Sequence, residues 1–301
     1  MVATVQVAVP VPVPYLFDYL PPSADGALAL GSRVLVPFGR RRLVGLVLGH
    51  GESAQTQSLK PIEAVLDPGL IKPPLLALAR WVVSYYACAP GEVVNLLLPP
   101  ALRRLKPFRT PPPARLVITP AGRAADVSRA PRQAEALRCL QAQVMEREEL
   151  LRLGISAATI KALADKGWIE AAEMGASTPA RPGPTLNAEQ RAALAALLRA
   201  RARHETLLLA GVTGSGKTEV YLRAAAAMLR RGRQVLLLIP EIGLTPQLIR
   251  RIEARLGVAV AVYHSDLSEG ERLSCWRSAA SGQASVIVGT RSAVFLPLSR
   301  P

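Results

Sequence analysis

Residues 211 to 218 have the types and the spacing of a phosphate-binding loop, Gly-Val-Thr-Gly-Ser-Gly-Lys-Thr. Glycines let the backbone curl until its N–H groups point inward at phosphate oxygens. Lys217 is placed to reach the β- and γ-phosphates of a nucleotide, and the Thr218 hydroxyl to ligate Mg²⁺. The sequence therefore predicts a nucleotide site formed by Gly211, Gly214, Ser215, Gly216, Lys217 and Thr218, in which Lys217 and Thr218 act on the phosphates.

The segments around this loop predict the elements that hold it. Residues 206–210 are typical of a short buried strand, and residues 219–230 of a helix that leaves the loop with its positive dipole end toward the phosphates. This strand and helix begin an alternation, which predicts a parallel sheet with ligands at the carboxyl ends of its strands. The later strands are expected at 234–239, 258–263 and 285–289, and the later helices at 246–256 and 270–281.

The amino-terminal region favours β-structure. Residues 2–9 alternate in polarity and are β-branched, and residues 33–36 and 43–48 flank a basic turn, which predicts a strand and then a hairpin. Residues 73–86 have helical periodicity with proline at the start. The aromatic side chains of this helix are expected in the core rather than on the surface as platforms for stacked bases; they are Trp81, Tyr85 and Tyr86.

Two proline-rich segments, 99–113 and 175–184, are predicted to be linkers. From Arg103 to Arg132 eight Lys or Arg residues stand against one acid, Asp126. This basic stretch fits a solvated spacer and a path along a phosphate backbone equally well. In the second case, Arg103, Arg104, Lys106 and Arg109 would carry the contacts.

The residues between the linkers predict a small helical module. A helix over 148–156 is expected to end at a glycine turn, and Ser156 to cap a second helix over 157–165 that leads into a strand. Helix, tight turn, helix and hairpin are typical of a winged-helix module. Such modules either enter a DNA groove or only pack against neighbouring domains. After the second linker, Asn187 is expected to cap a further helix.

Charge and composition narrow the classes of function. The chain has 37 Lys and Arg residues against 22 acids, a formal net charge of +15, which indicates a polyanionic partner such as nucleic acid or a compositional drift toward arginine. No apolar run approaches a membrane span and no signal peptide opens the chain, so a cytoplasmic protein is expected. The three cysteines are too few and too scattered for a disulfide framework or a zinc cluster; they are Cys88, Cys139 and Cys275.

Three strings, 211–221, 240–247 and 288–295, resemble the bacterial PriA replication-restart helicases (primosomal protein N′) of helicase superfamily 2. The residues at 9–14, 17–19 and 33–39 resemble the same family's domain for a DNA 3′ end. The resemblance implies an α/β chain with three domains. These are a β-rich DNA-binding domain over 1–105, a winged-helix-like domain over 106–178, and an incomplete RecA-like helicase lobe with a parallel sheet over 179–301.

The resemblance also implies roles for individual residues. Gln190 matches the glutamine that holds adenine, which makes ATP with Mg²⁺ the expected cofactor. The residues that match the family's DNA contacts are Phe17, Asp18, Gly39 and Lys60 around a 3′-terminal nucleotide, and Thr245, Thr290 and Arg291 along a single-strand track. The implied partners are forked and single-stranded DNA, single-strand-binding protein and other primosome proteins, with no membrane, in a nucleoid-associated cytoplasmic protein.

The sequence departs from this family at its end. It stops at Pro301, where the family runs into an acidic Asp-Glu-Glu-His motif, and the second helicase lobe and the cysteine-built zinc sites are missing. Phosphoryl transfer needs several parts at once, so we expect nucleotide and DNA binding without unwinding from this fragment. The alternative is a non-catalytic fork-binding adaptor with a vestigial nucleotide site. The amino-terminal strings disfavour a third possibility, a different phosphate-loop ATPase such as a transporter or kinase.

Overall fold

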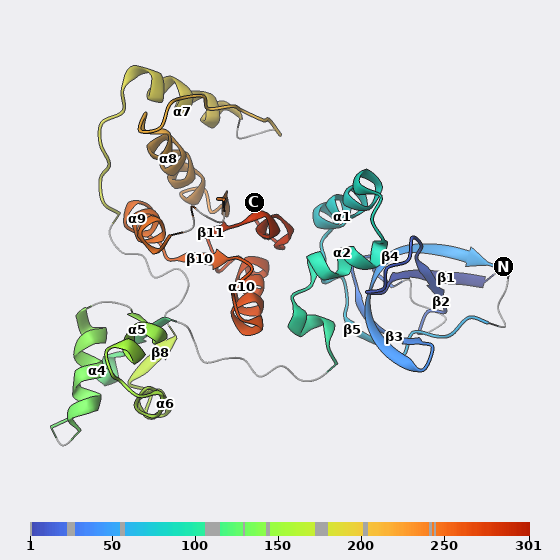
Figure 1. Ribbon diagram of the computed structural model, residues 1–301, viewed down its shortest axis with the longest axis horizontal. Helices are drawn as coiled ribbons and strands as arrows, with labels where there is room; N and C mark the ends of the chain where they lie inside the picture. Colours follow the sequence, from blue (N-terminus) through green and yellow to red (C-terminus); the bar gives the residue numbers. More distant parts are fainter. Residues whose placement is uncertain are drawn as a thin grey trace.

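A computed structural model describes the chain in three parts (Figure 1). Lys106 and Arg109 of the basic linker, and Glu241, Ile242 and Leu244 of the loop at 240–247, lie outside the described residues. No helix in the described part of the chain is both long and apolar enough to cross a membrane. The described residues are 2–22, 28–54, 58–105, 115–128, 130–142, 145–171, 180–200, 204–240, 243 and 245–301.

The amino-terminal part is a five-stranded antiparallel sheet in the order β2-β1-β4-β3-β5. The predicted hairpin is confirmed as the pairing of β3 with β4. The two edges of the sheet meet, because the Leu20 N–H donates to the Lys60 carbonyl and the Ile62 N–H to the Leu20 carbonyl, both at 3.0 Å. The strands are β1 (Val2–Ala8), β2 (Phe17–Tyr19), β3 (Arg33–Phe38), β4 (Arg41–Ser53) and β5 (Ala64–Asp67).

Two helices and a 3₁₀ turn follow the sheet: α1 (Pro73–Tyr86), α2 (Pro90–Leu97) and η1 (Pro100–Arg103). The helix predicted at 73–86 is confirmed, but the prediction that its aromatic side chains are core is wrong. Trp81, Tyr85 and Tyr86 are 51%, 67% and 65% exposed, and the Trp81 and Tyr85 rings stack at 4.7 Å. The apolar face of α1 is already supplied by smaller side chains, Leu75, Leu76, Ala79 and Val82.

The middle part has a hydrophobic core of its own, built from residues between Leu116 and Ile169. Its three short strands pair in the order β7-β6-β8. The prediction that Ser156 caps a helix is confirmed, since its side chain accepts from the Thr159 N–H at 3.1 Å. The elements are β6 (Arg115–Ile118), α3 (Pro120–Arg123), α4 (Pro131–Ala142), β7 (Met145–Glu146), α5 (Arg147–Arg152), α6 (Ala157–Asp165) and β8 (Ile169–Ala171).

The carboxy-terminal part is a parallel sheet in the order β10-β11-β9 with helices packed against it, as the alternation predicted. The strand predicted at 206–210 is absent: this segment pairs with none of the described strands, and Leu208 is 93% exposed. An apolar run becomes a strand only where a neighbour completes its hydrogen bonds. The elements are α7 (Ala188–Ala200), α8 (Lys217–Leu229), β9 (Val235–Leu238), α9 (Pro246–Leu256), β10 (Val260–Tyr263), α10 (Glu269–Ser281), β11 (Val286–Gly289) and η3 (Arg291–Phe295).

The first and last parts share one hydrophobic core. Leu46 and Leu97 belong to the same buried cluster as Trp276 and Ile287. The buried Trp276 indole N–H also donates to the Leu97 carbonyl at 2.9 Å, so α10 is tied to the end of α2 (Figure 1). The five-stranded sheet is therefore braced against the parallel sheet by packing, although about a hundred and eighty residues of sequence separate the two partners of this bond.

Candidate functional site

The glycine-rich loop lies at the start of α8 and turns sharply at two glycines. Gly214 and Gly216 have φ of 84° and 81°, values that L side chains rarely adopt, so other residues would strain the loop here. Gly216 is also the residue that precedes α8, and a Cβ there would collide with the Gln190 amide nitrogen. The loop is thus shaped as the sequence pattern requires, with the amino terminus of a helix of thirteen residues behind it.

Lys217 folds back onto the loop. Its ammonium group donates to the Val212 carbonyl at 2.8 Å and also to the Gly211 carbonyl. These two carbonyls hold the cation over the concave side of the loop, where nucleotide phosphates would replace them as stronger acceptors. The Thr218 side chain is exposed at the same end of α8.

Gln190 joins the loop to the helix before it. Its amide nitrogen donates to the Ser215 carbonyl at 2.9 Å, while its oxygen accepts from the Asn187 N–H at 3.0 Å. Asn187 in turn accepts from the Gln190 N–H at 2.8 Å, so the predicted cap of α7 is present and is reciprocal. The structure therefore places Gln190 beside the phosphate loop, with its amide already engaged by the loop backbone.

A pocket of about 510 Å³ opens over the loop, in the range of small-molecule sites. Beyond the predicted residues it includes Thr213 of the loop, Glu219 of α8, Arg251 of α9, and Pro184 and Thr185 before α7. The sequence motifs did not indicate the residues outside the loop. The pocket is lined by Pro184, Thr185, Gln190, Thr213, Gly214, Ser215, Gly216, Lys217, Thr218, Glu219 and Arg251.

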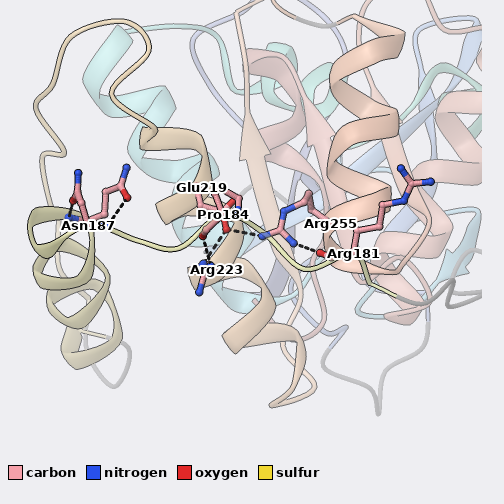
Figure 2. Close-up of polar contacts among 7 residues, drawn as sticks. Arg181, Pro184, Asn187, Glu219, Arg223 and Arg255 are labelled. Atoms are coloured by element: carbon pink, nitrogen blue, oxygen red, sulfur yellow. Dashed lines mark hydrogen bonds and ion pairs between the residues drawn. The ribbon is translucent and has the colours of Figure 1, made fainter.

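Behind the pocket, a buried carboxylate holds two arginines (Figure 2). Glu219 is 6% exposed, and one of its oxygens accepts from Arg223 at 2.8 Å and from Arg255 at 2.5 Å. Arg223 also donates to the Pro184 carbonyl at 2.7 Å, and Arg255 to the Arg181 carbonyl. The network therefore fastens the linker across α8 and α9, directly beside Thr218.

Sequence reasoning missed this network. The spacing of Glu219 and Arg223, four residues apart on one helix, was the available signal. Arg255 lies on another helix, so its contact depends on tertiary packing. Gly183 completes the arrangement, because a Cβ there would collide with the Glu219 carboxylate.

Burial of Glu219 acts to raise its pKa, but hydrogen bonds and charge from Arg223 and Arg255 outweigh it, and the pKa is lowered from 4.5. The stabilisation is therefore complete above the unfolded pKa and is lost as pH falls through the folded one. We expect Glu219→Gln to lower the free energy of unfolding at pH 7 by about 1–3 kcal/mol. The difference from wild type should shrink on acidification below about pH 4.5. Urea unfolding across the acid range measures it.

The matched control is Glu189→Gln, which removes an exposed carboxylate from the first turn of α7. Its effect should stay within about 0.5 kcal/mol at every pH. A Glu219→Gln variant with the same pH profile as this control would show that the network contributes nothing to stability.

Of the residues expected around a DNA 3′ end, Phe17 and Asp18 lie on the edge strand β2, Gly39 lies in the turn between β3 and β4, and Lys60 precedes β5. The Phe17 ring faces inward and meets Phe38, the neighbour of Gly39, at 5.1 Å. Asp18 faces outward and accepts from the Thr4 hydroxyl at 2.9 Å. Lys60 is exposed beside Leu20, with which its carbonyl is hydrogen-bonded. The structure thus packs Phe17 against Phe38, the residue before Gly39, and turns Asp18 to the opposite face.

The residues expected along a single-strand track lie at the carboxyl ends of the parallel strands. Thr245 caps α9, its hydroxyl accepting from the Leu248 N–H at 3.3 Å. Arg291 is exposed just after β11, whereas Thr290 is only 3% exposed and its N–H donates to the Tyr263 carbonyl at 3.1 Å. The Thr290 side chain therefore contributes to packing, and Thr245 and Arg291 are the two that reach the surface.

Two family models match the chain, one in its first part and one in its last part. Residues 6–99 match the family described as the PriA 3′DNA-binding domain, and residues 187–300 match the DEAD/DEAH box helicases. The chain thus joins a domain of a DNA-end-binding family to a domain of a helicase family.

Curated relatives make the assignment specific. The chain is 37% identical to replication restart protein PriA of Haemophilus influenzae over 98% of its length and 42% of the relative's. It is 32% identical to the PriA of Synechocystis sp. over 89% of the chain and 43% of the relative. It is also 32% identical to the PriA of Treponema pallidum, over 96% of the chain and 36% of the relative. The chain belongs to the PriA family, matches its amino-terminal part, and spans about two fifths of these relatives' length.

Proposed function

We propose that this chain is the DNA-recognising and nucleotide-binding part of an ATP-dependent replication-restart helicase, which binds stalled forks at a DNA 3′ end. The observation that carries the proposal is the phosphate loop at the start of α8, with Lys217 poised on it, in a part of the chain that shares a hydrophobic core with a domain of the 3′-DNA-binding family. The relatives named replication restart protein PriA support the biological role.

In this proposal the three parts have distinct tasks. Residues 1–105 bind the DNA end, residues 106–178 form a winged-helix-like module, and residues 179–301 form an incomplete RecA-like lobe. The helices α4 to α6 packed on the small sheet of β6, β7 and β8 support the second assignment. The parallel sheet after the phosphate loop supports the third. Forked and single-stranded DNA, single-strand-binding protein and other primosome proteins are the proposed partners.

The residues around the loop fit ATP with Mg²⁺. Lys217 and the loop N–H groups would bind the phosphates, the Thr218 hydroxyl would ligate the metal, and Gln190 would exchange its bond to Ser215 for one to adenine. Among the described residues no group of three or more His, Cys, Asp or Glu gathers to hold a metal by itself. The metal would therefore be bound mainly through the phosphates, as Mg²⁺ usually is in nucleotide sites.

The binding part of the proposal is tested by fluorescence anisotropy. The chain should bind a fork with a free 3′ end more tightly than a blunt duplex of equal length, and should bind a fluorescent ATP analogue in the presence of Mg²⁺. A duplex closed by hairpin loops at both ends has no free 3′ end, and equal affinity for the fork and this closed duplex would contradict recognition of a DNA end.

A second test concerns the role of Asp18 at the DNA 3′ end. An exposed carboxylate repels phosphates, but it can accept a hydrogen bond from the uncharged 3′-hydroxyl, a charge-assisted bond of about 1.5–3 kcal/mol. A 3′-phosphate would bring like charges together instead. We expect several-fold weaker binding of a fork whose strand ends in 3′-phosphate, and no difference between the two ends in Asp18→Ala.

The control variant is Glu52→Ala, which removes an exposed carboxylate from β4 in the same sheet. This variant should keep the preference for the 3′-hydroxyl. Equal binding of both ends by the wild-type chain would remove Asp18 from the proposed contact with DNA.

A further inference from the structure

A second groove, of about 470 Å³, lies between β4 and the segment that follows η1. It is mixed in character: arginines face it from both sides, and its floor is apolar. Of its lining residues, only Pro10 falls within one of the family strings, 9–14. The lining residues are Pro10, Arg42, Leu43, Val44, Arg103, Arg104 and Leu105.

Positive charge exceeds negative charge around this groove. Arg42 pairs with Glu63 at 2.8 Å and Arg104 with Glu269 at 2.6 Å, but both arginines keep well over half of their side-chain surface exposed. Arg103 donates to the Asn95 amide oxygen at 2.5 Å, and its buried Nε has no acceptor among the described residues. The exposed guanidinium groups of Arg42 and Arg104 therefore keep donors for an anionic ligand.

The electrostatics of Arg103 agree with this excess. Burial and then the positive charge of Arg104 lower its pKa, Glu269 opposes them, and Arg272 of α10 lowers it again. Arg103 nevertheless stays charged at neutral pH, as arginines do in proteins. An incoming phosphate would relieve the repulsion among these cations.

The groove begins at the hairpin proposed to meet the DNA end. Arg42 lies opposite Pro37 in the pairing of β3 with β4, three residues after Gly39 in the turn of that hairpin. A strand whose last nucleotide rests at Gly39 has its preceding phosphodiesters within reach of Arg42. Planar guanidinium groups match phosphate oxygens in pairs, and the apolar floor suits sugar rings.

We propose that this groove binds the phosphodiester backbone just upstream of the 3′-terminal nucleotide, through Arg42, Arg103 and Arg104. The inference rests on the proposed binding of a DNA 3′ end and extends it from one nucleotide to a short strand. It also assigns the first part of the basic stretch, Arg103 and Arg104, to a phosphate path rather than to a solvated spacer.

The test compares two double variants with the same loss of charge. Arg42→Gln/Arg104→Gln alters the groove at side chains that are 67% and 62% exposed, so folding should be preserved. Arg231→Gln/Arg233→Gln alters an exposed turn at the end of α8 and is the control. The ligands are a dinucleotide with a 3′-hydroxyl and a strand of about six nucleotides, a usual length for a small DNA-binding barrel.

We expect the groove variant to bind the longer strand at least about fivefold more weakly than the control variant, and to lose less affinity for the dinucleotide, which carries a single phosphodiester. The slope of log affinity against log salt should become shallower by about 0.7 for each phosphate that the variant no longer neutralises. Replacing single upstream phosphodiesters by neutral methylphosphonates should weaken wild-type binding and should have no further effect in the groove variant.

The outcomes separate this inference from the proposed function. If the wild type binds 3′-ended DNA but the groove and control variants behave alike, the inference about the groove is overturned and the proposed DNA-end function stands. If the wild type binds no 3′-ended DNA, both are overturned. If the groove variant loses binding of inorganic phosphate alone yet responds to methylphosphonates as the wild type does, the groove is a free-anion site and the inference is again overturned.

Discussion

Replacing Lys217 by alanine is expected to weaken binding of an ATP analogue by about a hundredfold. The ammonium group now donates to the Gly211 and Val212 carbonyls, and in the nucleotide complex it would donate to two phosphates instead. Charge-assisted hydrogen bonds are worth about 1.5–3 kcal/mol each, and about 2.7 kcal/mol corresponds to a hundredfold change in affinity. Titration with a fluorescent ATP analogue and Mg²⁺ measures the effect.

Two comparisons make this result specific. Lys161→Ala removes an exposed lysine from α6 in the middle part and should leave nucleotide affinity unchanged. Lys217→Ala itself should keep its affinity for 3′-ended DNA, because the DNA-end residues lie on the five-stranded sheet. Unchanged nucleotide affinity in Lys217→Ala would mean that the loop is vestigial, as in the alternative of a fork-binding adaptor.

Replacing Trp276 by alanine is expected to lower the free energy of unfolding by about 3–5 kcal/mol, the usual cost of removing a buried tryptophan. The side chain is 4% exposed, packs in the core shared by the first and last parts, and bonds the Leu97 carbonyl. Its loss would leave a cavity and an unpaired carbonyl on the side of α2. Urea or thermal unfolding measures the change.

The matched control is Trp81→Ala, the same substitution at a tryptophan that is 51% exposed on α1. This variant should change stability by less than about 1 kcal/mol. In Trp276→Ala, affinity for 3′-ended DNA should fall at temperatures where the last part unfolds, because both parts depend on one core. Equal stability of the two variants would contradict the shared core.

Local chemistry determined most of the elements. The helix predicted at 246–256 is found with these bounds, because Thr245 caps its start, proline occupies its first turn, and Gly257 ends it with a φ of 69°. The cap at Asn187 and the alternation of strands and helices were predicted for the same kind of reason. Each depends on residues only a few positions apart.

The wrong predictions concern segments whose structure depends on residues that are distant in the sequence. Residues 206–210 have the composition of a strand but meet no partner among the described strands, and the aromatic residues of α1 are exposed because smaller residues already fill its buried face. The local sequence pattern predicts neither outcome. Both follow from which surfaces meet in three dimensions.

The sequence by itself determined the phosphate loop, because the positive-φ turns at Gly214 and Gly216 and the cation at Lys217 are properties of one short segment. Short strings also led to the prediction of the DNA-end residues, which remains a prediction. Only the tertiary structure decided that Glu219 holds Arg255, that Trp276 of α10 bonds the end of α2, and that Arg42 and Arg104 line one groove. The physical reason is that ion pairs, core packing and clustered charge act through space, between residues that the chain keeps far apart.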